Sequence, residues 1–289
     1  MGRATTPATQ ETMVRANGVD ICVGTVGDPD DPAMLLIHGA ASSMDWWEDE
    51  FCARLAAGGR FVVRYDHRDT GRSVTGAPGE PDYTMDDLVA DPIGVLDALG
   101  LARAHVMGMS MGGAIAQLLA LDHADRVATL TLVATSPSGP GADGLPPMTD
   151  ELQAHFAAPR PEPDWSDRAA VVEWLVEVIR PYAGSHPVDE GALRRLAERV
   201  VDRSTDVAAG ANHFAVEGGG PWRHRLGGIT APTLVVHGAE DPLFPLPHGR
   251  ALADEIPGAR LLILDRTGHE LPRPTWDVVV PAVLAHTAR

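Results

Sequence analysis

Lysine is absent from this sequence, so arginine fills all 23 of the positions that could hold lysine or arginine. A lysine amine is needed to form a Schiff base with a carbonyl substrate or to anchor pyridoxal phosphate. The G-x-x-x-x-G-K-[ST] loop that cradles nucleotide phosphates also requires a lysine. The sequence therefore excludes Schiff-base chemistry, pyridoxal phosphate and a nucleotide loop of that type.

Positive charge is in the minority, because 23 basic residues face 40 Asp and Glu residues, for a formal net charge of −17. Such a surface repels nucleic-acid phosphates and anionic lipid headgroups, and no basic cluster offsets it. No apolar run approaches the roughly 20 residues that a membrane-spanning helix needs. We therefore expect neither a nucleic acid nor a membrane among the partners.

Cysteine is scarce: Cys22 and Cys52 are the two in the chain, and they do not form a C-x-x-C pair. Each lies in an apolar or mixed segment, which favours buried free thiols in a reducing compartment. The first residues, MGRATTPATQET, lack the apolar region of a secretory signal. These features predict a cytoplasmic protein.

Strand-like and helix-like segments alternate along the 289 residues, of which 44% are hydrophobic. Asn17-Gly18 predicts the turn of a hairpin over residues 14–26. Further strands are predicted at residues 34–38, 61–65, 104–108, 129–135, 232–237 and 260–264, and helices at 85–99, 110–122, 248–255 and 275–287. This alternation is typical of an α/β protein with a mostly parallel, doubly wound sheet.

The alternation stops at SPSGPGADGLPP, residues 136–147, where the density of glycine and proline indicates a linker. From there to about Arg225 no convincing strand occurs, and residues 167–180, 189–202 and 205–214 have helical patterns. The expected organisation is an α/β core in two parts, residues 1–135 and 226–289, with a helical cap inserted at residues 136–225.

Loops at the carboxyl ends of parallel strands meet at one edge of the sheet, so residues distant in sequence can come together there. Ser110 lies in such a loop, GMSMG, between a predicted strand and a predicted helix. A strand that runs directly into a helix needs a strained turn with small neighbours, which Gly108 and Gly112 provide. The turn presents the hydroxyl at a helix N-terminus, where negative charge is favoured. Ser110 is therefore the predicted nucleophile, and it requires a nearby base.

His269 is the best of the 12 histidines for that base, because it follows the strand predicted at residues 260–264. A neutral imidazole that receives a proton needs a carboxylate behind it, and Asp241 follows the strand at 232–237. Glu240, next to it, is the competing acid. The chain order Ser, Asp, His is expected of one serine-hydrolase architecture and of neither protease type.

Two backbone N–H groups are candidates to stabilise the anion that forms when a serine attacks a carbonyl. Met111 follows the nucleophile at the start of the helix, and Ala40 follows His38-Gly39 at another strand end. The sequence predicts an oxyanion hole made of these two groups.

Other polar residues at the strand ends favour structural roles. His38 and His237 each precede a glycine, but H-E-x-x-H spacing and a cysteine partner are missing, so no metal site is expected. Four charged residues follow the strand predicted at residues 61–65: Asp66, Arg68, Asp69 and Arg72. They form either a charged active-site loop or, as we favour, a buried salt-bridge network.

Five residues are candidates for a substrate pocket. Trp46 follows the oxyanion loop, and Met109 precedes the nucleophile; each either lines the pocket or only packs. In the predicted cap the candidates are Trp174, His213 and Phe214.

Taken together, GMSMG, HGAA, HGAEDPLFP and TGHELP resemble the nucleophile, oxyanion, acid and base loops of the α/β-hydrolase superfamily, over nearly the whole chain. Within it, YDHRDTGRS, LALDHADRV and DPLFPLPHGRAL are similar to polyketide methyl esterases of the aclacinomycin methylesterase kind. The loop HGAA departs from a run of three glycines, so the resemblance implies a hole built from Ala40 and Met111 and gives no support for bulky tertiary-alcohol esters.

We expect a cofactor-free serine hydrolase whose partner is a small or medium hydrophobic carboxylic ester, and the resemblance implies a polyketide methyl ester. Three alternatives stay open: a lactonase or C–C bond hydrolase, a cofactor-free perhydrolase or haloperoxidase-like enzyme, and a non-catalytic ligand-binding protein. The sequence leaves the oligomeric state undetermined.

Overall fold

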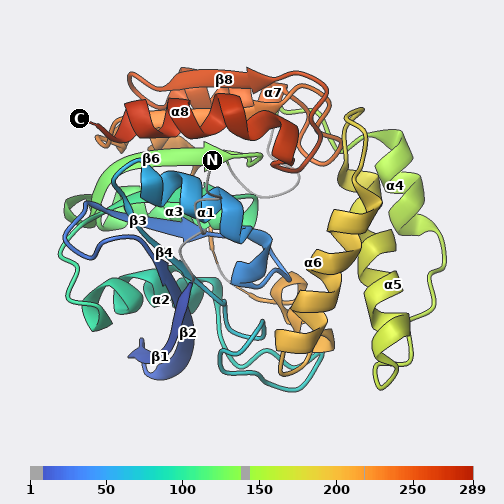
Figure 1. Cartoon of the computed structure of the whole chain (residues 1–289). Helices are drawn as coiled ribbons and strands as arrows, with labels where there is room; N and C mark the ends of the chain where they lie inside the picture. The colour runs from blue at the N-terminus through green and yellow to red at the C-terminus, as the bar shows by residue number, and fades with distance from the viewer. Residues whose placement is uncertain (1–8, 138–143, 218, 289) are drawn as a thin grey trace, which may run out of the picture.

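The computed structural model describes residues 9–137, 144–217 and 219–288, and within them the chain forms an eight-stranded sheet (Figure 1). The strand order is β1-β2-β4-β3-β5-β6-β7-β8, and pairing is parallel from β4 to β8 and antiparallel for β1 with β2 and β2 with β4. The strands are β1 (Gln10–Ala16), β2 (Val19–Val26), β3 (Ala33–Ile37), β4 (Phe61–Tyr65), β5 (Ala104–Met109), β6 (Val127–Val133), β7 (Thr233–Gly238) and β8 (Arg260–Leu264). The predicted mostly parallel α/β sheet is confirmed.

The β1–β2 hairpin turns at the predicted dipeptide. Asn17 and Gly18 both have positive φ, 46° and 77°, as a two-residue turn that matches the twist of the strands requires. This hairpin adds the antiparallel edge to an otherwise parallel sheet.

Helices cover both faces of the sheet, and each face has its own apolar cluster. On one face lie α1 (Asp49–Ala57) and α8 (Trp276–Thr287); on the other lie α2 (Met85–Ala98), α3 (Met111–Asp122) and α7 (Pro247–Glu255). Every residue of β3, β5 and β7 is buried, because side chains on both sides of these strands meet a helix layer. The continuous apolar runs of the sequence reflect this double coverage.

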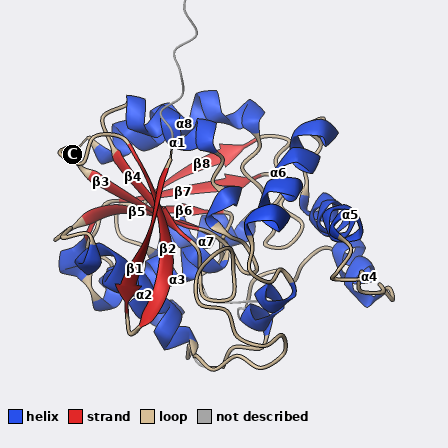
Figure 2. Cartoon of the chain, turned by 60° about the horizontal axis from the view of Figure 1, so that its bottom comes forward, coloured by secondary structure: helices blue, strands red, loops and turns tan. Residues whose placement is uncertain are grey.

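Between β6 and β7 the chain leaves the sheet, and its described residues there form three α-helices, α4 (Asp150–Ala157), α5 (Arg168–Ile179) and α6 (Glu190–Arg203). Figures 1 and 2 show them standing together beside the core, on the side toward which the parallel strands point. Each begins at a side-chain cap that accepts a backbone N–H: Thr149, Asp167 and Asp189. Val172, Leu175 and Val176 of α5 pack on α6 to give this cap a small core of its own.

The predicted helical insertion is therefore present, although its boundaries at residues 136 and 225 stay a prediction. Residues 138–143 of the predicted linker, and residues 1–8 at the N-terminus, lie outside the described residues. No helix in the described ranges combines the length and the apolarity needed to cross a membrane.

The prediction of an α-helix at residues 205–214 is wrong, because the structure has a 3₁₀ helix there, η4 (Ala208–Phe214). Gly210 weakens an α-helix there and approaches Ala41, and the side chains of Asn212 and His213 bind loops of the core. The structure also contains two α-helices, α1 and α4, that the sequence pattern does not predict. The other 3₁₀ segments are η1 (Met44–Trp46), η2 (Ala124–Arg126), η3 (Arg180–Tyr182), η5 (Arg223–Gly228) and η6 (Arg273–Thr275).

Candidate active site

Ser110 occupies a strained turn between β5 and α3, with φ 54° and ψ −120°. A non-glycine residue in this region costs on the order of 1–3 kcal/mol and persists only where its surroundings fix it. Here the Ser110 N–H donates to the carbonyl of Val133 (3.0 Å), and the hydroxyl of Thr135 donates to the Ser110 carbonyl (2.8 Å). The neighbouring strand β6 and the loop after it therefore hold the turn that the sequence predicts.

The two predicted glycines make this turn possible. A Cβ on Gly108 would lie 2.1 Å from the carbonyl oxygen of Gly112, and one on Gly112 would lie 2.2 Å from that of Ile37. Gly113, for which the sequence carries no such signal, is also confined, since a Cβ there would lie 2.6 Å from the side chain of Thr135. Larger residues would push α3 away from the sheet.

Asp241 and His269, from the loops after β7 and β8, form a hydrogen bond of 2.9 Å between Oδ2 and Nδ1. The other carboxylate oxygen accepts the N–H groups of Leu243 and Phe244, both at 2.9 Å. Burial raises the pKa of Asp241, but His269 above all, and then His237 and the Phe244 N–H, outweigh it, so the pKa lies below its usual value. Asp241 is therefore an ionised carboxylate, and because it can only accept, the His269 ring carries a proton on Nδ1.

Glu240, the competing acid, has a different task. Its two carboxylate oxygens accept from the N–H (2.7 Å) and the hydroxyl (3.0 Å) of Ser185 in the cap. The segment around Ser185 is held further by Gly184, whose N–H donates to Glu270 (2.9 Å). Glu240 thus ties the cap to the acid loop, and Asp241 is the carboxylate that meets His269.

Two aromatic rings that the sequence analysis missed flank His269. Tyr182, at the end of η3 in the cap, and Phe244, after β7, have ring centroids 5.8 Å and 5.5 Å from the imidazole. The carbonyl of Tyr182 also accepts the N–H of His269 at 2.7 Å. The sequence gives little indication of these contacts, because Tyr182 lies 87 positions before His269.

The loop His38-Gly39-Ala40-Ala41 runs beside Ser110, since a Cβ on Gly39 would lie 3.1 Å from the Cβ of Ser110. Met111 is the first residue of α3, so its N–H has no acceptor within the helix. In the described part of the chain the Ala40 N–H also donates to no protein acceptor. Among the described residues, both N–H groups are thus without a protein acceptor near the serine, and their role as an oxyanion hole stays a prediction.

The pocket candidates divide into three groups. Met109 is 7% exposed at the end of β5, while Trp46 and Trp174 pack against the core of the cap. His213 is buried, with both ring nitrogens hydrogen-bonded to backbone groups. Phe214 has 74% of its surface exposed. Contact with substrate stays a prediction for all five; the structure adds that His213 binds backbone groups and that Phe214 lies at the surface.

His38 and His237 are buried neutral histidines. Burial lowers the pKa of His38 to about 3, and it lowers that of His237 as well. The ring of His38 packs edge-on against Trp47, and Nε2 of His237 lies 2.7 Å from the carbonyl oxygen of Phe244. Among the described residues, no three His, Cys, Asp or Glu side chains gather as metal ligands.

Two of the four charged residues after β4, Asp66 and Arg68, form the favoured buried salt bridges, whereas the Asp69 carboxylate accepts from neutral groups, the Tyr83 hydroxyl and the Asn212 amide. Asp66, fully buried, receives two guanidinium nitrogens of Arg203 at 2.7 and 2.9 Å, and Arg68 pairs with buried Asp91 at 2.8 Å. Arg72 differs, because its side chain is 55% exposed and pairs with a surface glutamate. The main partner, Arg203, comes from the last turn of α6, so the network joins the cap to the core.

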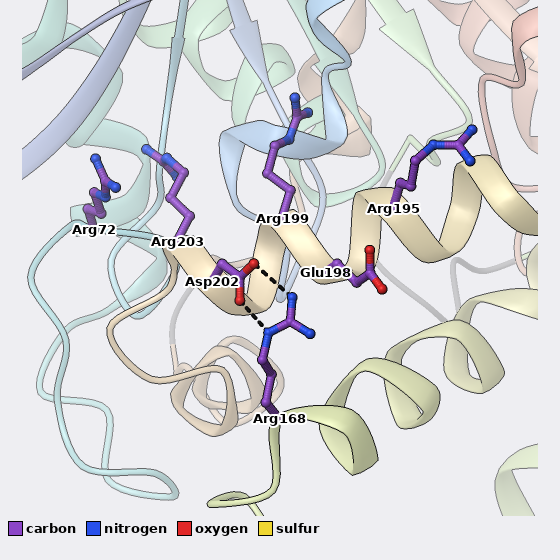
Figure 3. A pocket seen from close by; sticks show the side chains of 7 residues that line it. All are labelled: Arg72, Arg168, Arg195, Glu198, Arg199, Asp202 and Arg203. Atoms are coloured by element: carbon purple, nitrogen blue, oxygen red, sulfur yellow. Dashed lines mark hydrogen bonds and ion pairs between the residues drawn. The ribbon is translucent and has the colours of Figure 1, made fainter.

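A shallow cavity of about 430 Å³ lies beside this network, between the start of α5, α6 and the loop after β4 (Figure 3). Its lining is rich in arginine: Arg72, Arg168, Arg195, Glu198, Arg199, Asp202 and Arg203. The guanidinium of Arg168 pairs with Asp202 at 2.5 and 2.8 Å, and that of Arg199 pairs with Asp49 at 2.6 Å. Protein carboxylates therefore neutralise most of this positive charge.

The family model of the alpha/beta hydrolase fold matches residues 32–272 of this chain. The observed fold and the arrangement of its loops agree with that match. The chain belongs to this family. It is 36% identical to a rhodomycin D methylesterase of Streptomyces sp. strain C5, over 95% of this chain and 97% of that one. It is 34% identical to a rhodomycin D methylesterase of Streptomyces peucetius, again over 95% and 97%.

Solved structures agree on the fold. The esterase RhEst1 from Rhodococcus sp. ECU1013 superposes with a TM-score of 0.77 at 23% identity, covering 97% of this chain and 98% of that one. The enol-lactonase from Burkholderia xenovorans LB400 superposes with a TM-score of 0.73 at 24% identity, covering 96% and 100%. The protein is thus a hydrolase-fold member whose closely matching curated relatives include methylesterases, which supports esterase activity in the broad sense.

Proposed function

We propose that this protein is a cofactor-free serine hydrolase that cleaves carboxylic esters through an acyl-enzyme, with Ser110, His269 and Asp241 as its triad. The observation that carries the proposal is the Asp241–His269 hydrogen bond in loops at the sheet edge where the strained turn of Ser110 also lies. A carboxylate, an imidazole and a serine in this relation activate the hydroxyl for attack.

In the first half of the reaction, the Ser110 hydroxyl attacks the acyl carbon while its proton passes to Nε2 of His269. Asp241 stabilises the imidazolium, which then gives the proton to the leaving alcohol. The N–H groups of Ala40 and Met111 bind the oxyanion, and each such donor supplies about 3–4 kcal/mol of transition-state stabilisation. In the second half, His269 takes a proton from water, the hydroxide attacks the acyl carbon, and the acid leaves as Ser110 regains its proton.

The favoured substrate is a methyl ester of a polyketide-like compound. Two nearly full-length relatives at 36% and 34% identity are named for methyl ester cleavage on rhodomycin D, which supports this class. Met109, Trp46 and Trp174 are the side chains we propose for an apolar pocket that receives it. Two buried free cysteines are in keeping with a cytoplasmic location.

A substrate panel tests the proposal: an anthracycline-type methyl ester, p-nitrophenyl acetate, a lactone, a vinylogous diketone for C–C cleavage, and peroxide with acetate and bromide. We expect ester hydrolysis with the highest kcat/KM on the methyl ester, and its loss in Ser110→Ala. Preferred turnover of the lactone or the diketone, or peroxide-dependent halogenation, would replace the esterase assignment. If nothing turns over and a fluorophosphonate leaves Ser110 unlabelled, the protein is a ligand-binding one.

A further inference from the structure

Ala41, at the end of the loop that carries Ala40, has an unfavourable backbone conformation with φ 55°. A left-handed backbone costs an alanine roughly 1–2 kcal/mol, so neighbouring groups must hold it in place. The cap supplies them. The Ala41 N–H donates to Nδ1 of His213 at 2.9 Å, and a Cβ on Gly210 would lie 3.4 Å from the Cα of Ala41.

The partners of His213 define its tautomer. Its Nε2 lies 2.8 Å from the carbonyl oxygen of Arg68, and because a carbonyl can only accept, Nε2 carries the proton. Nδ1 is then an acceptor, as the Ala41 N–H requires. Burial, and next the neighbouring His67, lower the pKa of His213 to about 4, so the ring is neutral at ordinary pH. The imidazole thus bridges the oxyanion loop and the loop after β4.

The other end of the oxyanion loop is held in a similar way. Nε2 of His67 lies 3.0 Å from the carbonyl oxygen of His38, and the rings of His67 and His213 meet edge to face at 5.6 Å. The hydroxyl of Ser42 donates to the carbonyl of Ala40 at 3.1 Å. The peptide planes on both sides of the 39–40 peptide are therefore fixed, and that peptide carries the Ala40 N–H.

We propose that His213 is a positioning residue for the oxyanion hole: its Nδ1 anchors the Ala41 N–H, and the anchored loop aims the Ala40 N–H at the substrate oxygen. The inference deepens, and rests on, the proposed function, because it assigns His213 a task at the same site. His213 itself does not touch the reacting atoms. Its position in the cap makes the completed hole depend on cap docking.

Two substitutions at position 213 test whether the hydrogen-bond acceptor for the Ala41 N–H, and not the imidazole ring as a whole, is what the loop needs. In His213→Asn the side-chain oxygen takes the place of Nδ1 and can still accept from Ala41, whereas His213→Leu has no acceptor. With p-nitrophenyl acetate, we expect His213→Leu to lower kcat by about 10- to 100-fold, less than the 10²–10³ of a fully lost donor, with little change in KM. The asparagine variant should recover most of that loss.

A merely structural role predicts a different outcome. Tyr83→Phe is the matched control, because it removes a buried hydrogen bond to Asp69 (2.7 Å) in the same cluster without a partner in the oxyanion loop. It should lower the melting temperature and leave kcat unchanged. A trifluoromethyl ketone, whose adduct places an oxyanion in the hole, should lose affinity for His213→Leu in proportion to kcat/KM and keep its affinity for the control.

Hydrogen exchange of the Ala41 amide tests the anchor independently of catalysis. The amide should be protected in the wild type and in His213→Asn, and exchange much faster in His213→Leu. If His213→Leu does not fold, His213→Gln replaces it, because its amide reaches the position of Nε2 and leaves Ala41 unpaired.

The inference is overturned if the variant without the acceptor keeps wild-type kcat and ketone affinity, or if Ala41 exchange is the same in every variant. A wild-type protein that hydrolyses no ester would instead remove the proposed function, while the exchange rates still report on the anchor.

Discussion

Arg203 gives the sharpest stability prediction, because its side chain is 7% exposed and binds a carboxylate, Asp66, that is fully buried. Arg203→Met keeps an unbranched but shorter, uncharged side chain and leaves Asp66 without its cationic partner, while Asp45, which Arg203 also binds, keeps Arg199 at 3.3 Å. Removing one member of a buried ion pair costs about 3–5 kcal/mol. In the variant, Asp66 still accepts the backbone N–H groups of Met44 (2.9 Å) and Arg72 (3.0 Å). Because these bonds partly stabilise the buried charge, we expect a loss at the lower end of that range, about 3 kcal/mol.

That free energy converts into a measurable shift of the melting temperature. At about 2.1 cal/mol/K per residue, unfolding 289 residues has an entropy of about 0.6 kcal/mol/K, so Arg203→Met should melt about 5 °C below the wild type. Differential scanning calorimetry at neutral pH measures it. The double variant Arg203→Met/Asp66→Asn should recover part of the loss, because the buried charge is then gone.

Arg168→Met is the matched control. It breaks the ion pair with Asp202 that joins α5 to α6, but both side chains are more than half exposed. An exposed pair contributes little, so this variant should melt close to the wild type. Equal melting temperatures for the Arg203 and Arg168 variants would refute the reasoning that burial gives the cap–core network its strength.

Three further predictions follow from the site and the core. Asp241→Asn should lower kcat by about 10³–10⁴ in a p-nitrophenyl acetate assay, whereas Glu240→Gln should retain catalysis; the reverse pattern would exchange their roles. Gly112→Ala, whose Cβ would lie 2.2 Å from the carbonyl oxygen of Ile37, should destabilise the protein and slow fluorophosphonate labelling; wild-type melting and labelling would contradict the strained turn. The free energy of unfolding should fall as the pH drops from 6.5 toward 4, because histidines of the unfolded chain bind protons in this range and the buried neutral histidines of the folded protein do not. Unfolding measured across this range should therefore take up more than one proton. Burial lowers the pKa of these histidines to about 3 in His38 and about 4 in His67, His105 and His213, and a flat profile over this range would argue against neutral burial.

Much of the fold was predictable because local signals agreed with the tertiary structure. The apolar runs of β3, β5 and β7 are buried on both faces, and Asn17-Gly18 could adopt the positive φ of its turn at low cost. The same agreement holds at the strand ends, where Asp241 and His269 meet as the chain order predicts.

What the sequence did not reveal depends on contacts between distant segments. Arg203 lies in a helix of ordinary charge pattern, and its partner Asp66 is 137 residues away. The sequence offers His213 as a pocket residue, and nothing local indicates that its ring also binds the backbone of Ala41 across 172 residues. Helix patterns report the face that a helix buries, but they do not identify the loop against which the cap docks.

Covalent labelling tests the central claim most directly. The protein is incubated with a fluorophosphonate, and the adduct is located by mass spectrometry of its peptides, with Ser110→Ala and His269→Ala alongside. The account predicts one stoichiometric adduct on Ser110, absent from the alanine variant at that position and formed far more slowly without His269. Labelling at another residue, or unaltered labelling and ester hydrolysis in Ser110→Ala, would contradict it.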